Sequence, residues 1–147
     1  MIRRFEQKDL DQIMRIEAQA FPKSPYTREM FMAYHRSFPA TFLVFEEDAL
    51  LAYIIFKLDG HVVSLAVDPA HRRRKIGTRL MKACESRCRA DRFLVEVREG
   101  NVRAQRFYER LGFRMKSKIR RYYGTEDAYV MEKARSQVDR KGITGDS

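Results

Sequence analysis

The chain has 147 residues, 44% of them hydrophobic and 12% aromatic, and it carries a formal net charge of +10. This apolar content predicts one globular domain with a buried core, and it excludes a disordered chain or a small disulfide-stapled peptide. There is no apolar run of about 18 residues, and the beginning, MIRRFEQKDL, lacks the apolar stretch of a signal peptide, so we expect a soluble cytoplasmic protein. The charge indicates an anionic partner without choosing between a phosphate-bearing ligand, RNA and acidic peptides.

The beginning of the chain predicts a short strand followed by two helices. Ile2–Glu6 is expected to form the strand, and Asp9 with Gln12 resembles the capping box that begins a helix. Two prolines in FPKSPYT interrupt the helical pattern, after which Thr27 can cap a second helix in TREMFMAYHRS. The aromatic loop between these helices is therefore a candidate lip for a ligand site.

The stretch from Thr41 to Val67 is dominated by β-branched and aromatic residues. The segments TFLVFEE, LLAYIIFKL and HVVSLAV alternate with the turn-like EEDA and KLDGH. Runs of this composition, separated by such turns, are typical of strands connected as hairpins. The sequence therefore predicts a meander of antiparallel strands here.

The second half of the chain alternates between helical and extended patterns. A helix is expected from about Lys75 to Arg89, followed by the strand FLVEVRE and by the helix VRAQRFYERLG, which ends at Gly112. Two further strands are expected around FRMKSKIRRYY and DAYVMEK. These patterns predict a mixed α/β domain over residues 1–133 and a flexible polar tail over residues 134–147.

Two cysteines, Cys84 and Cys88, follow Ile76 and Leu80 at the spacing of one helix face. We expect them to be buried by packing. A pair of this spacing without nearby histidine is weak evidence for zinc, and neighbouring turns of one helix are poorly placed for a disulfide. We therefore assign the cysteines no chemistry and expect no metal site.

The turn AHRRRKIGTRL places four consecutive cations between a predicted strand and a predicted helix. A helix that begins directly after a strand presents unpaired backbone N–H groups and the positive end of its dipole, which suits an anion such as pyrophosphate. The patterns G-x-x-x-x-G-K-[ST] and G-x-G-x-x-G are both absent, which excludes a Walker loop and a dinucleotide fingerprint.

Val67-Asp68-Pro69, followed by Arg72, Lys75 and Gly77, resembles motif A of the GNAT superfamily of N-acetyltransferases, whose pattern is [QR]-x-x-G-x-[GA]. The resemblance implies the GNAT fold, with a twisted, mostly antiparallel sheet of about seven strands, about four flanking helices and a splay at the strand that ends near Val67. It also implies acetyl-CoA as co-substrate, its pyrophosphate held by the turn and its pantetheine arm paired with the strand. The implied coenzyme-binding residues are Leu65, Ala66, Val67, Arg72, Arg73, Arg74, Lys75, Ile76, Gly77 and Thr78.

Lys75 stands where this motif has its first glycine. A glycine at that position permits close backbone approach and positive φ, which the Cβ of lysine makes more costly. The backbone N–H of Lys75 remains, and its ammonium group could add a contact to phosphate. We therefore expect coenzyme binding to persist.

A second resemblance covers the segment EVREGNVRAQRFYERLGF, from Glu96 to Phe113. It is similar to the pattern E-V-R-x-x-N-x-x-A-x-x-[FL]-Y-x-x-x-G-F of the RimI-like subgroup, the N-terminal protein acetyltransferases. RRYY followed by EDAYVM is similar to the closing hairpin of that subgroup, and EAQAFPKSPYTREMF to its beginning. The resemblance thus extends over roughly residues 1–133.

The RimI-like resemblance implies roles for three side chains. Glu96, a carboxylate in the apolar segment FLVEV, lies at the position of a general base, and the alternative is a structural ion pair with Arg98 or an outward-facing strand residue. Tyr108 lies at the position of the general acid that protonates the coenzyme A sulfur, and core packing beside Phe107 is the alternative. Asn101 is implied as a coenzyme contact and is also a typical N-cap, two roles that are compatible.

The implied reaction is direct attack of an amine on the thioester in a ternary complex, with the backbone N–H of Val67 stabilising the oxyanion. An α-amine with a pKa of about 7.8 is roughly 14% neutral at pH 7, against about 0.04% for a lysine. This difference favours a protein N-terminus as acceptor. Tyr122 and Tyr123 are implied to hold the peptide, with Tyr26 and Phe31 on the opposite lip unless they belong to the core.

Three functions therefore remain open. The first is acetylation of a protein or peptide N-terminus, with a ribosomal protein as acceptor or the ribosome as partner. The second is acetylation of a small-molecule amine or a lysine side chain, and the third is a non-catalytic basic module that binds RNA or the ribosome. The set of Glu96, Asn101 and Tyr108 favours an enzyme. We expect no membrane partner and no specific nucleic acid partner.

Overall fold

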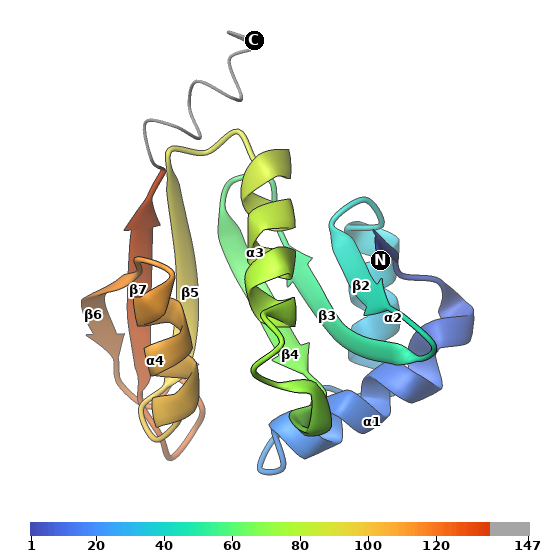
Figure 1. Cartoon of the computed structure of the whole chain (residues 1–147). Helices are drawn as coiled ribbons and strands as arrows, with labels where there is room; N and C mark the ends of the chain where they lie inside the picture. Colours follow the sequence, from blue (N-terminus) through green and yellow to red (C-terminus); the bar gives the residue numbers. More distant parts are fainter. Residues whose placement is uncertain (136–147) are drawn as a thin grey trace, which may run out of the picture. The chain divides into compact units, whose positions relative to one another are not determined.

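The computed structural model describes residues 1–135, and within them seven strands form one open, mostly antiparallel sheet with four α-helices (Figure 1). The strands are β1 (Ile2–Arg4), β2 (Phe42–Glu46), β3 (Leu50–Phe56), β4 (His61–Val67), β5 (Arg92–Arg98), β6 (Arg114–Ile119) and β7 (Ala128–Ala134), in the sheet order β1-β2-β3-β4-β5-β7-β6. The helices are α1 (Leu10–Ala20), α2 (Arg28–Ser37), α3 (Ile76–Arg87) and α4 (Val102–Arg110). The predicted mixed α/β architecture is confirmed.

The chain divides into two compact units. The first unit comprises residues 1–57 and 63–84, and the second comprises residues 58–62 together with the chain from residue 85 onward. β4 and α3 each begin in one unit and end in the other. Within the described part of the chain, no helix is both long enough and apolar enough to span a membrane.

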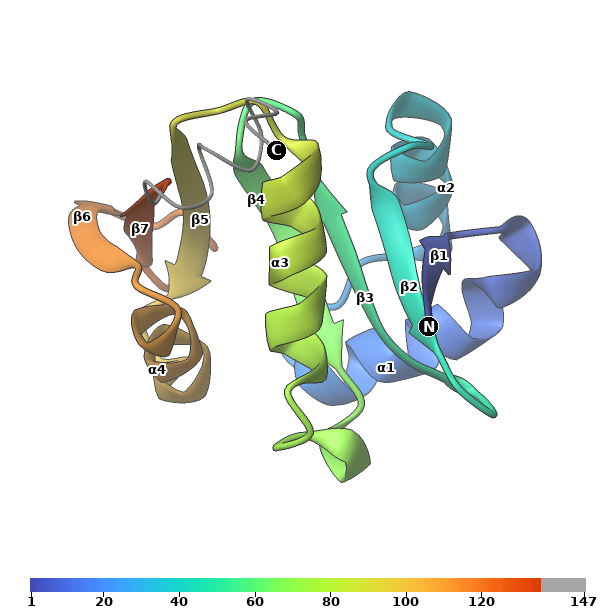
Figure 2. The same ribbon diagram turned by 45° about the horizontal axis from the view of Figure 1, so that its top comes forward.

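The core of the first unit lies between the helices α1 and α2 and the strands β2 and β3. Figures 1 and 2 show these two helices on the face of the strands opposite to α3. Every residue of β3 is buried, which explains why LLAYIIF is apolar without alternation. The buried cluster consists of Phe5, Leu10, Ile13, Ile16, Phe31, Phe42, Val44, Leu50, Tyr53, Ile55 and Ala66.

The ends of the helices follow local sequence chemistry in three of the predicted places. The hydroxyl of Thr27 accepts a hydrogen bond from the N–H of Met30 at 3.2 Å and caps α2. The carbonyl oxygen of the Asn101 side chain accepts one from the N–H of Ala104 at 3.1 Å and caps α4. After α4, Gly112 has a φ of +103°, the left-handed conformation that ends many helices. These predictions are confirmed.

The capping box predicted from Asp9 and Gln12 is wrong. The carboxylate of Asp9 instead accepts two hydrogen bonds from Arg3, both at 2.9 Å, and one from the N–H of Glu6 at 2.8 Å. The side-chain oxygen of Gln12 accepts a hydrogen bond from the N–H of Leu50 at 3.2 Å. A buried carboxylate binds a neighbouring guanidinium more strongly than a helix N–H, so Asp9 pairs with Arg3 and does not cap the helix.

The second unit contains α4 and strands β5, β6 and β7. β7 is antiparallel to both β5 and β6. Along β5, Phe93, Val95 and Val97 are buried, while the residues between them are half-buried, as the alternation of a strand requires. The other buried core residues of this unit include Tyr108, Phe113, Ala128 and Met131.

Arg135, the residue after β7, is 7% exposed and anchors the end of the strand to the last turn of α3 and the chain that follows it. Its guanidinium donates to the carbonyl oxygens of Glu85 at 2.9 Å, Cys88 at 2.8 Å and Ala90 at 2.8 Å. β7 includes Ala134, and Arg135 is fixed by these three hydrogen bonds, so the boundary of the predicted tail lies two residues inside the described structure. Residues 136–147 of the predicted tail lie outside the described residues.

Replacing Arg135 with alanine is expected to lower the free energy of unfolding by about 2 kcal/mol, because it leaves the buried carbonyl groups without donors. Arg135→Lys should recover only part of the loss, since one ammonium group cannot reproduce the planar fork of a guanidinium. Urea denaturation of the three proteins measures the effect. A loss below about 0.5 kcal/mol would show that water replaces the guanidinium at these carbonyls.

Candidate active site

The turn between β4 and α3 lies in the first unit and has the backbone of an anion-binding site. The side chain of Asp68 accepts a hydrogen bond from the N–H of Ala70 at 2.9 Å, which begins a short turn. Arg73 and Lys75 then adopt left-handed conformations, with φ of 73° and 60°. Such a backbone turns N–H groups to one side, and the first N–H groups of α3 have no acceptor within the helix. Binding of the pyrophosphate of acetyl-CoA by this turn stays a prediction.

The cations of this turn do not all face an open site. The guanidinium of Arg74 donates to both carboxylate oxygens of Glu47, at 2.8 and 2.9 Å. This hydrogen bonding lowers the pKa of Glu47. Arg74 thereby braces the turn against the β2–β3 connection. Within residues 1–135, the cations of the turn without an ion pair are Arg72, Arg73 and Lys75.

The strand that precedes the turn has the alternation expected of it. Ala66 is 4% exposed and faces the core of the first unit, whereas Leu65 and Val67 are half-buried on the other face. The N–H of Asp68 donates to the carbonyl oxygen of Leu51 at 2.7 Å, which joins the end of β4 to the beginning of β3. The pairing of residues 65–67 with pantetheine stays a prediction.

Replacing Lys75 with glycine is expected to raise the free energy of unfolding by about 1 kcal/mol, because glycine adopts a φ of 60° without the steric cost of a Cβ. Coenzyme A affinity should be equal or higher, as measured by isothermal titration. Lys75→Ala is the matched control, since it removes the ammonium group and keeps the Cβ. A large loss of affinity in both variants would instead assign a phosphate contact to the ammonium group.

Glu96 and His61 form a polar pair on one face of the second unit. β4 and β5 are parallel, with His61 opposite Leu94. Because side chains alternate along a strand, Glu96 shares the face of Leu94 and lies diagonally from His61. The Nε2 atom of His61 is 2.8 and 3.0 Å from the two oxygens of the Glu96 carboxylate. Since a carboxylate only accepts, this nitrogen is the donor.

The sequence reasoning missed His61. Its signal was a histidine at the beginning of an apolar strand, directly after the turn Asp59-Gly60, but only the register shows what it faces. Gly60 makes this register possible: its φ is +100°, and its carbonyl oxygen accepts a hydrogen bond from the N–H of Leu94 at 3.0 Å. A Cβ at Gly60 would lie 2.2 Å from the carbonyl oxygen of Arg92.

Tyr122 and Tyr123, in the β6–β7 connection, lie beside Glu96. Their hydroxyl groups are 3.5 Å from Oε1 and 3.4 Å from the backbone oxygen of Glu96. The guanidinium of Arg98 lies 4.1 Å from the ring centre of Tyr123 and pairs with Glu126 at 3.0 Å, so the alternative pairing of Glu96 with Arg98 does not occur. Burial, followed by the neighbouring Tyr122, raises the pKa of Tyr123 to about 12, which keeps its hydroxyl a donor.

The positions of Tyr108 and Asn101 are compatible with both the structural and the functional role that the sequence left open for each of them. Tyr108 is 5% exposed, and its ring packs edge-on against Phe107 and Phe113, with centroids 5.0 and 5.3 Å away. Core packing therefore occurs, and the general-acid role stays a prediction. The side-chain oxygen of Asn101 binds the N–H of Ala104, which leaves its NH2 group without a partner within residues 1–135. That group remains a donor for the coenzyme.

Tyr26 and Phe31 differ in their exposure. Phe31 is 0% exposed, and its ring lies 5.6 Å from the rings of Tyr53 and Tyr26. It therefore belongs to the core of the first unit and cannot touch an acceptor directly. Tyr26 is half-buried at the edge of that core and remains a candidate for the acceptor lip.

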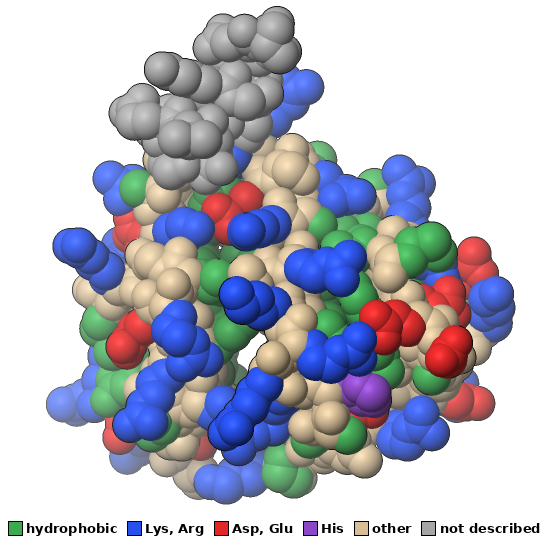
Figure 3. Space-filling model, viewed as in Figure 1, with side chains coloured by type: hydrophobic (Ala, Val, Ile, Leu, Met, Phe, Trp, Pro, Cys, Tyr) green, Lys and Arg blue, Asp and Glu red, His purple; other side chains and the backbone are tan. Residues whose placement is uncertain are grey.

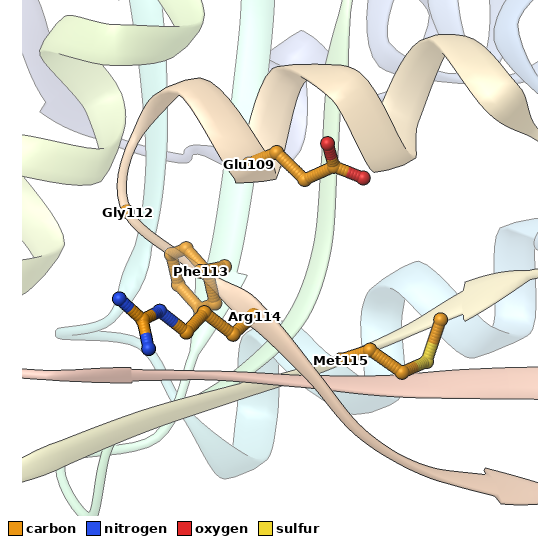
Figure 4. A pocket seen from close by; sticks show the side chains of 5 residues that line it. All are labelled: Glu109, Gly112, Phe113, Arg114 and Met115. Carbon is orange, nitrogen blue, oxygen red and sulfur yellow. The ribbon is translucent and has the colours of Figure 1, made fainter.

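A hollow of about 510 Å³ lies in the second unit where α4 leads into β6 (Figure 4). It is lined by Glu109, Gly112, Phe113, Arg114 and Met115, all from one continuous stretch of chain. It contains none of the residues that the sequence assigns to acetyl transfer. We therefore give it no part in the reaction.

Basic side chains extend well beyond the turn. Figure 3 shows lysine and arginine side chains spread over the visible face of the molecule. On α4, Arg103, Arg106 and Arg110 are exposed at helical spacing, and none of them has an ion pair within residues 1–135. The net positive charge is therefore a property of the surface at large, and the turn holds only part of it.

This chain is similar to N-acetyltransferases over most of its length. Residues 10–113 match the Acetyltransferase (GNAT) family. The chain is 38% identical over 142 residues to an uncharacterised N-acetyltransferase of Methanocaldococcus jannaschii, with 90% of each chain covered. It is 34% identical over 151 residues to an N-alpha-acetyltransferase of Sulfurisphaera tokodaii, with 88% of this chain and 90% of that protein covered.

The fold also has a close counterpart among crystal structures. Naa20 of Chaetomium thermophilum, in complex with a bisubstrate analogue, superposes with a TM-score of 0.84 at 25% identity, covering 100% of this chain and 93% of the other. Motif, fold and relatives thus point to one family. The chain is an N-acetyltransferase that belongs to the Acetyltransferase (GNAT) family.

Proposed function

We propose that this enzyme transfers the acetyl group of acetyl-CoA to the N-terminal α-amine of a protein or peptide. The observation that carries the proposal is the carboxylate of Glu96, held by His61 with the hydroxyls of Tyr122 and Tyr123 beside it. The relative from Sulfurisphaera tokodaii, whose name states N-alpha-acetyltransferase, supports this acceptor class. A cytoplasmic location stays a prediction from the sequence.

Glu96 is the proposed general base. Its side chain is 19% exposed, so an amine or a bridging water can reach it while the surrounding protein limits its hydration. His61 donates to both carboxylate oxygens and so fixes their direction. An α-amine is about 14% neutral at pH 7, so an appreciable fraction can attack directly, and Glu96 accepts the proton that the amine releases as it reacts.

Acetyl-CoA supplies an activated thioester, which an amine can attack without a covalent enzyme intermediate. The residues proposed to hold it are the turn from Arg72 to Thr78, through its backbone N–H groups, and the free NH2 group of Asn101. Tyr108 is proposed to deliver a proton to the departing sulfur. Cys84 and Cys88 are both buried, which leaves no exposed thiol in residues 1–135 to form an acyl-enzyme.

Tyr122 and Tyr123 of the second unit are proposed to contact the peptide, and Tyr26 of the first unit is a separate proposed contact, as the family resemblance implies. Tyr123 is suited to bind a peptide carbonyl because its hydroxyl stays protonated and its ring is held under Arg98. Tyr122 is 49% exposed and can adjust to the bound chain. The three side chains offer hydroxyl donors and aromatic faces, which recognise backbone and side chain of an extended peptide.

Peptides with free N-termini, incubated with isotope-labelled acetyl-CoA, test the proposal by mass spectrometry. Peptides with the N-terminal sequences of ribosomal proteins are included because the RimI-like resemblance implies a ribosomal protein as a possible acceptor. We expect the label on the α-amine and none on matched peptides that are blocked at the N-terminus and contain lysine. Label only on lysine, or only on small amines such as polyamines, would contradict the proposal and support the second function considered above.

A further inference from the structure

A buried carboxylate outside the proposed chemistry lies in the middle of α1. Glu17 is 2% exposed and shares a helix face with the core residues Ile13 and Ile16. Within residues 1–135 it forms no ion pair with lysine, arginine or histidine. Burial of a carboxylate without a cation is costly, so such a residue needs neutral donors of good geometry.

Neutral donors from separate segments meet this carboxylate. Its Oε2 atom accepts a hydrogen bond from the backbone N–H of Tyr26 at 2.8 Å, and its Oε1 atom accepts one from the hydroxyl of Tyr53. The Tyr53 hydroxyl is also 2.8 Å from the Oγ atom of Ser64. Glu17 therefore connects the loop after α1 with β3 directly and with β4 through Tyr53.

The loop over residues 21–27 is held by few backbone hydrogen bonds, although the side chains of Phe21 and Tyr26 pack against the core of the first unit. Pro22 and Pro25 have no N–H to donate, and residues 22–25 are exposed. Its internal hydrogen bond, from the N–H of Ser24 to the carbonyl oxygen of Phe21, is long at 3.3 Å. The bond from Tyr26 to Glu17 lies at the far end of this exposed stretch, where it directs the chain into α2.

The surroundings of Glu17 favour this structural use over chemistry. Burial raises its pKa, while the hydrogen bonds from Tyr53 and Tyr26 oppose that change. Burial, followed by the charge of Glu17, raises the pKa of Tyr53 well above its usual value. An apolar residue would fill the space without the cost of burying a charge, but it could not accept from both donors.

We infer that Glu17 is a positioning residue that fixes the acceptor lip, because its carboxylate fastens the backbone of Tyr26 to the core of the first unit. The inference rests on the proposed function insofar as Tyr26 contacts the acceptor. It extends that function because it names Glu17 as the group that sets the shape of the lip. Glu17 itself touches neither the acceptor nor the coenzyme. Loss of the fastening should weaken acceptor binding and leave coenzyme binding alone.

Three variants separate fastening from general stability. Glu17→Leu keeps the volume and removes the acceptor for the N–H of Tyr26, and replacement of a buried charge by an apolar side chain usually preserves folding. Glu17→Gln keeps an oxygen that can accept from Tyr26. Tyr53→Phe removes the other donor of the same cluster and leaves the bond between Glu17 and Tyr26 intact.

The first measurement is native-state trypsin cleavage after the exposed Lys23, expressed relative to cleavage in the second unit. Loss of one well-formed hydrogen bond is expected to accelerate this cleavage about tenfold in Glu17→Leu. The second measurement is steady-state kinetics, in which KM for the peptide should rise about tenfold while KM for acetyl-CoA stays within about twofold. Glu17→Gln and Tyr53→Phe should stay near the wild-type protein in both.

The outcomes decide whether Glu17 fastens the backbone of Tyr26 or only occupies space in the core. Equal acceleration in Glu17→Leu and Tyr53→Phe, or no acceleration in either, would overturn the inference. So would a rise in KM for acetyl-CoA equal to that for the peptide. If cleavage after Lys23 responds as expected but no peptide is acetylated, the fastening stands and the proposed function fails, which keeps the two results distinguishable.

Discussion

Replacing Glu96 with glutamine is expected to lower kcat by about 10²- to 10³-fold, because the amide has the shape of the carboxylate but cannot take a proton from the amine. Coenzyme A affinity should remain within about twofold of the wild-type value, since Glu96 is not among the residues proposed to hold the coenzyme. Steady-state acetylation of a peptide gives kcat, and isothermal titration gives the affinity. Unchanged kcat would remove Glu96 from the reaction.

The matched control is Glu99→Gln. Glu99 follows the same strand, is 43% exposed in its side chain and pairs with Lys118 at 3.1 Å. An exposed ion pair of this kind contributes little to stability, so the substitution should leave both folding and kcat close to wild type. A comparable loss in both variants would indicate a general effect of removing negative charge, and the role of Glu96 would fail.

His61 offers an independent check on the same pair. If it acts only by directing the Glu96 carboxylate, His61→Ala should lower kcat, whereas adding it to Glu96→Gln should cost little more. If the decrease in kcat of the double variant equals the product of the decreases in the two single variants, His61 acts on the substrate independently of Glu96. The double-mutant cycle thus separates positioning from direct participation.

Replacing Gly60 with alanine is expected to lower the free energy of unfolding by about 3 kcal/mol. At a φ of +100°, the new Cβ would strain the backbone and also lie 2.2 Å from the carbonyl oxygen of Arg92, which is backbone and cannot rotate away. Relief of this contact requires β4 and β5 to separate where His61 meets Leu94. The loss of stability, measured by urea denaturation, should therefore accompany a loss of kcat.

Gly124→Ala provides the control for this prediction. Gly124 also has a positive φ, +84°, but its added Cβ would meet no atom within 4 Å. Gly124→Ala should therefore lower the free energy of unfolding only by the cost of a Cβ at positive φ, about 1 to 2 kcal/mol. Equal destabilisation by the two substitutions would show that the contact with Arg92 is relieved without cost, and the link between Gly60 and the Glu96 pair would be refuted.

Local chemistry explains why much of the fold could be predicted. The cap at Thr27 and the left-handed turn at Gly112 depend on residues within a few positions, so their patterns are readable in the sequence. The failed capping box at Asp9 shows the limit of such reasoning. Its carboxylate had a stronger partner in Arg3, on a strand that lies beside it only after folding.

Motif spacing by itself determined the family resemblance, the coenzyme turn and the three candidates Glu96, Asn101 and Tyr108, because each is set by neighbours along one segment. The tertiary structure alone decided what those residues face. His61 reaches Glu96 through the register of two strands, and Tyr26 reaches Glu17 through the packing of a loop onto α1. Register and packing join residues far apart in the chain, and no local pattern encodes which of the many sterically acceptable pairs the core will bury together.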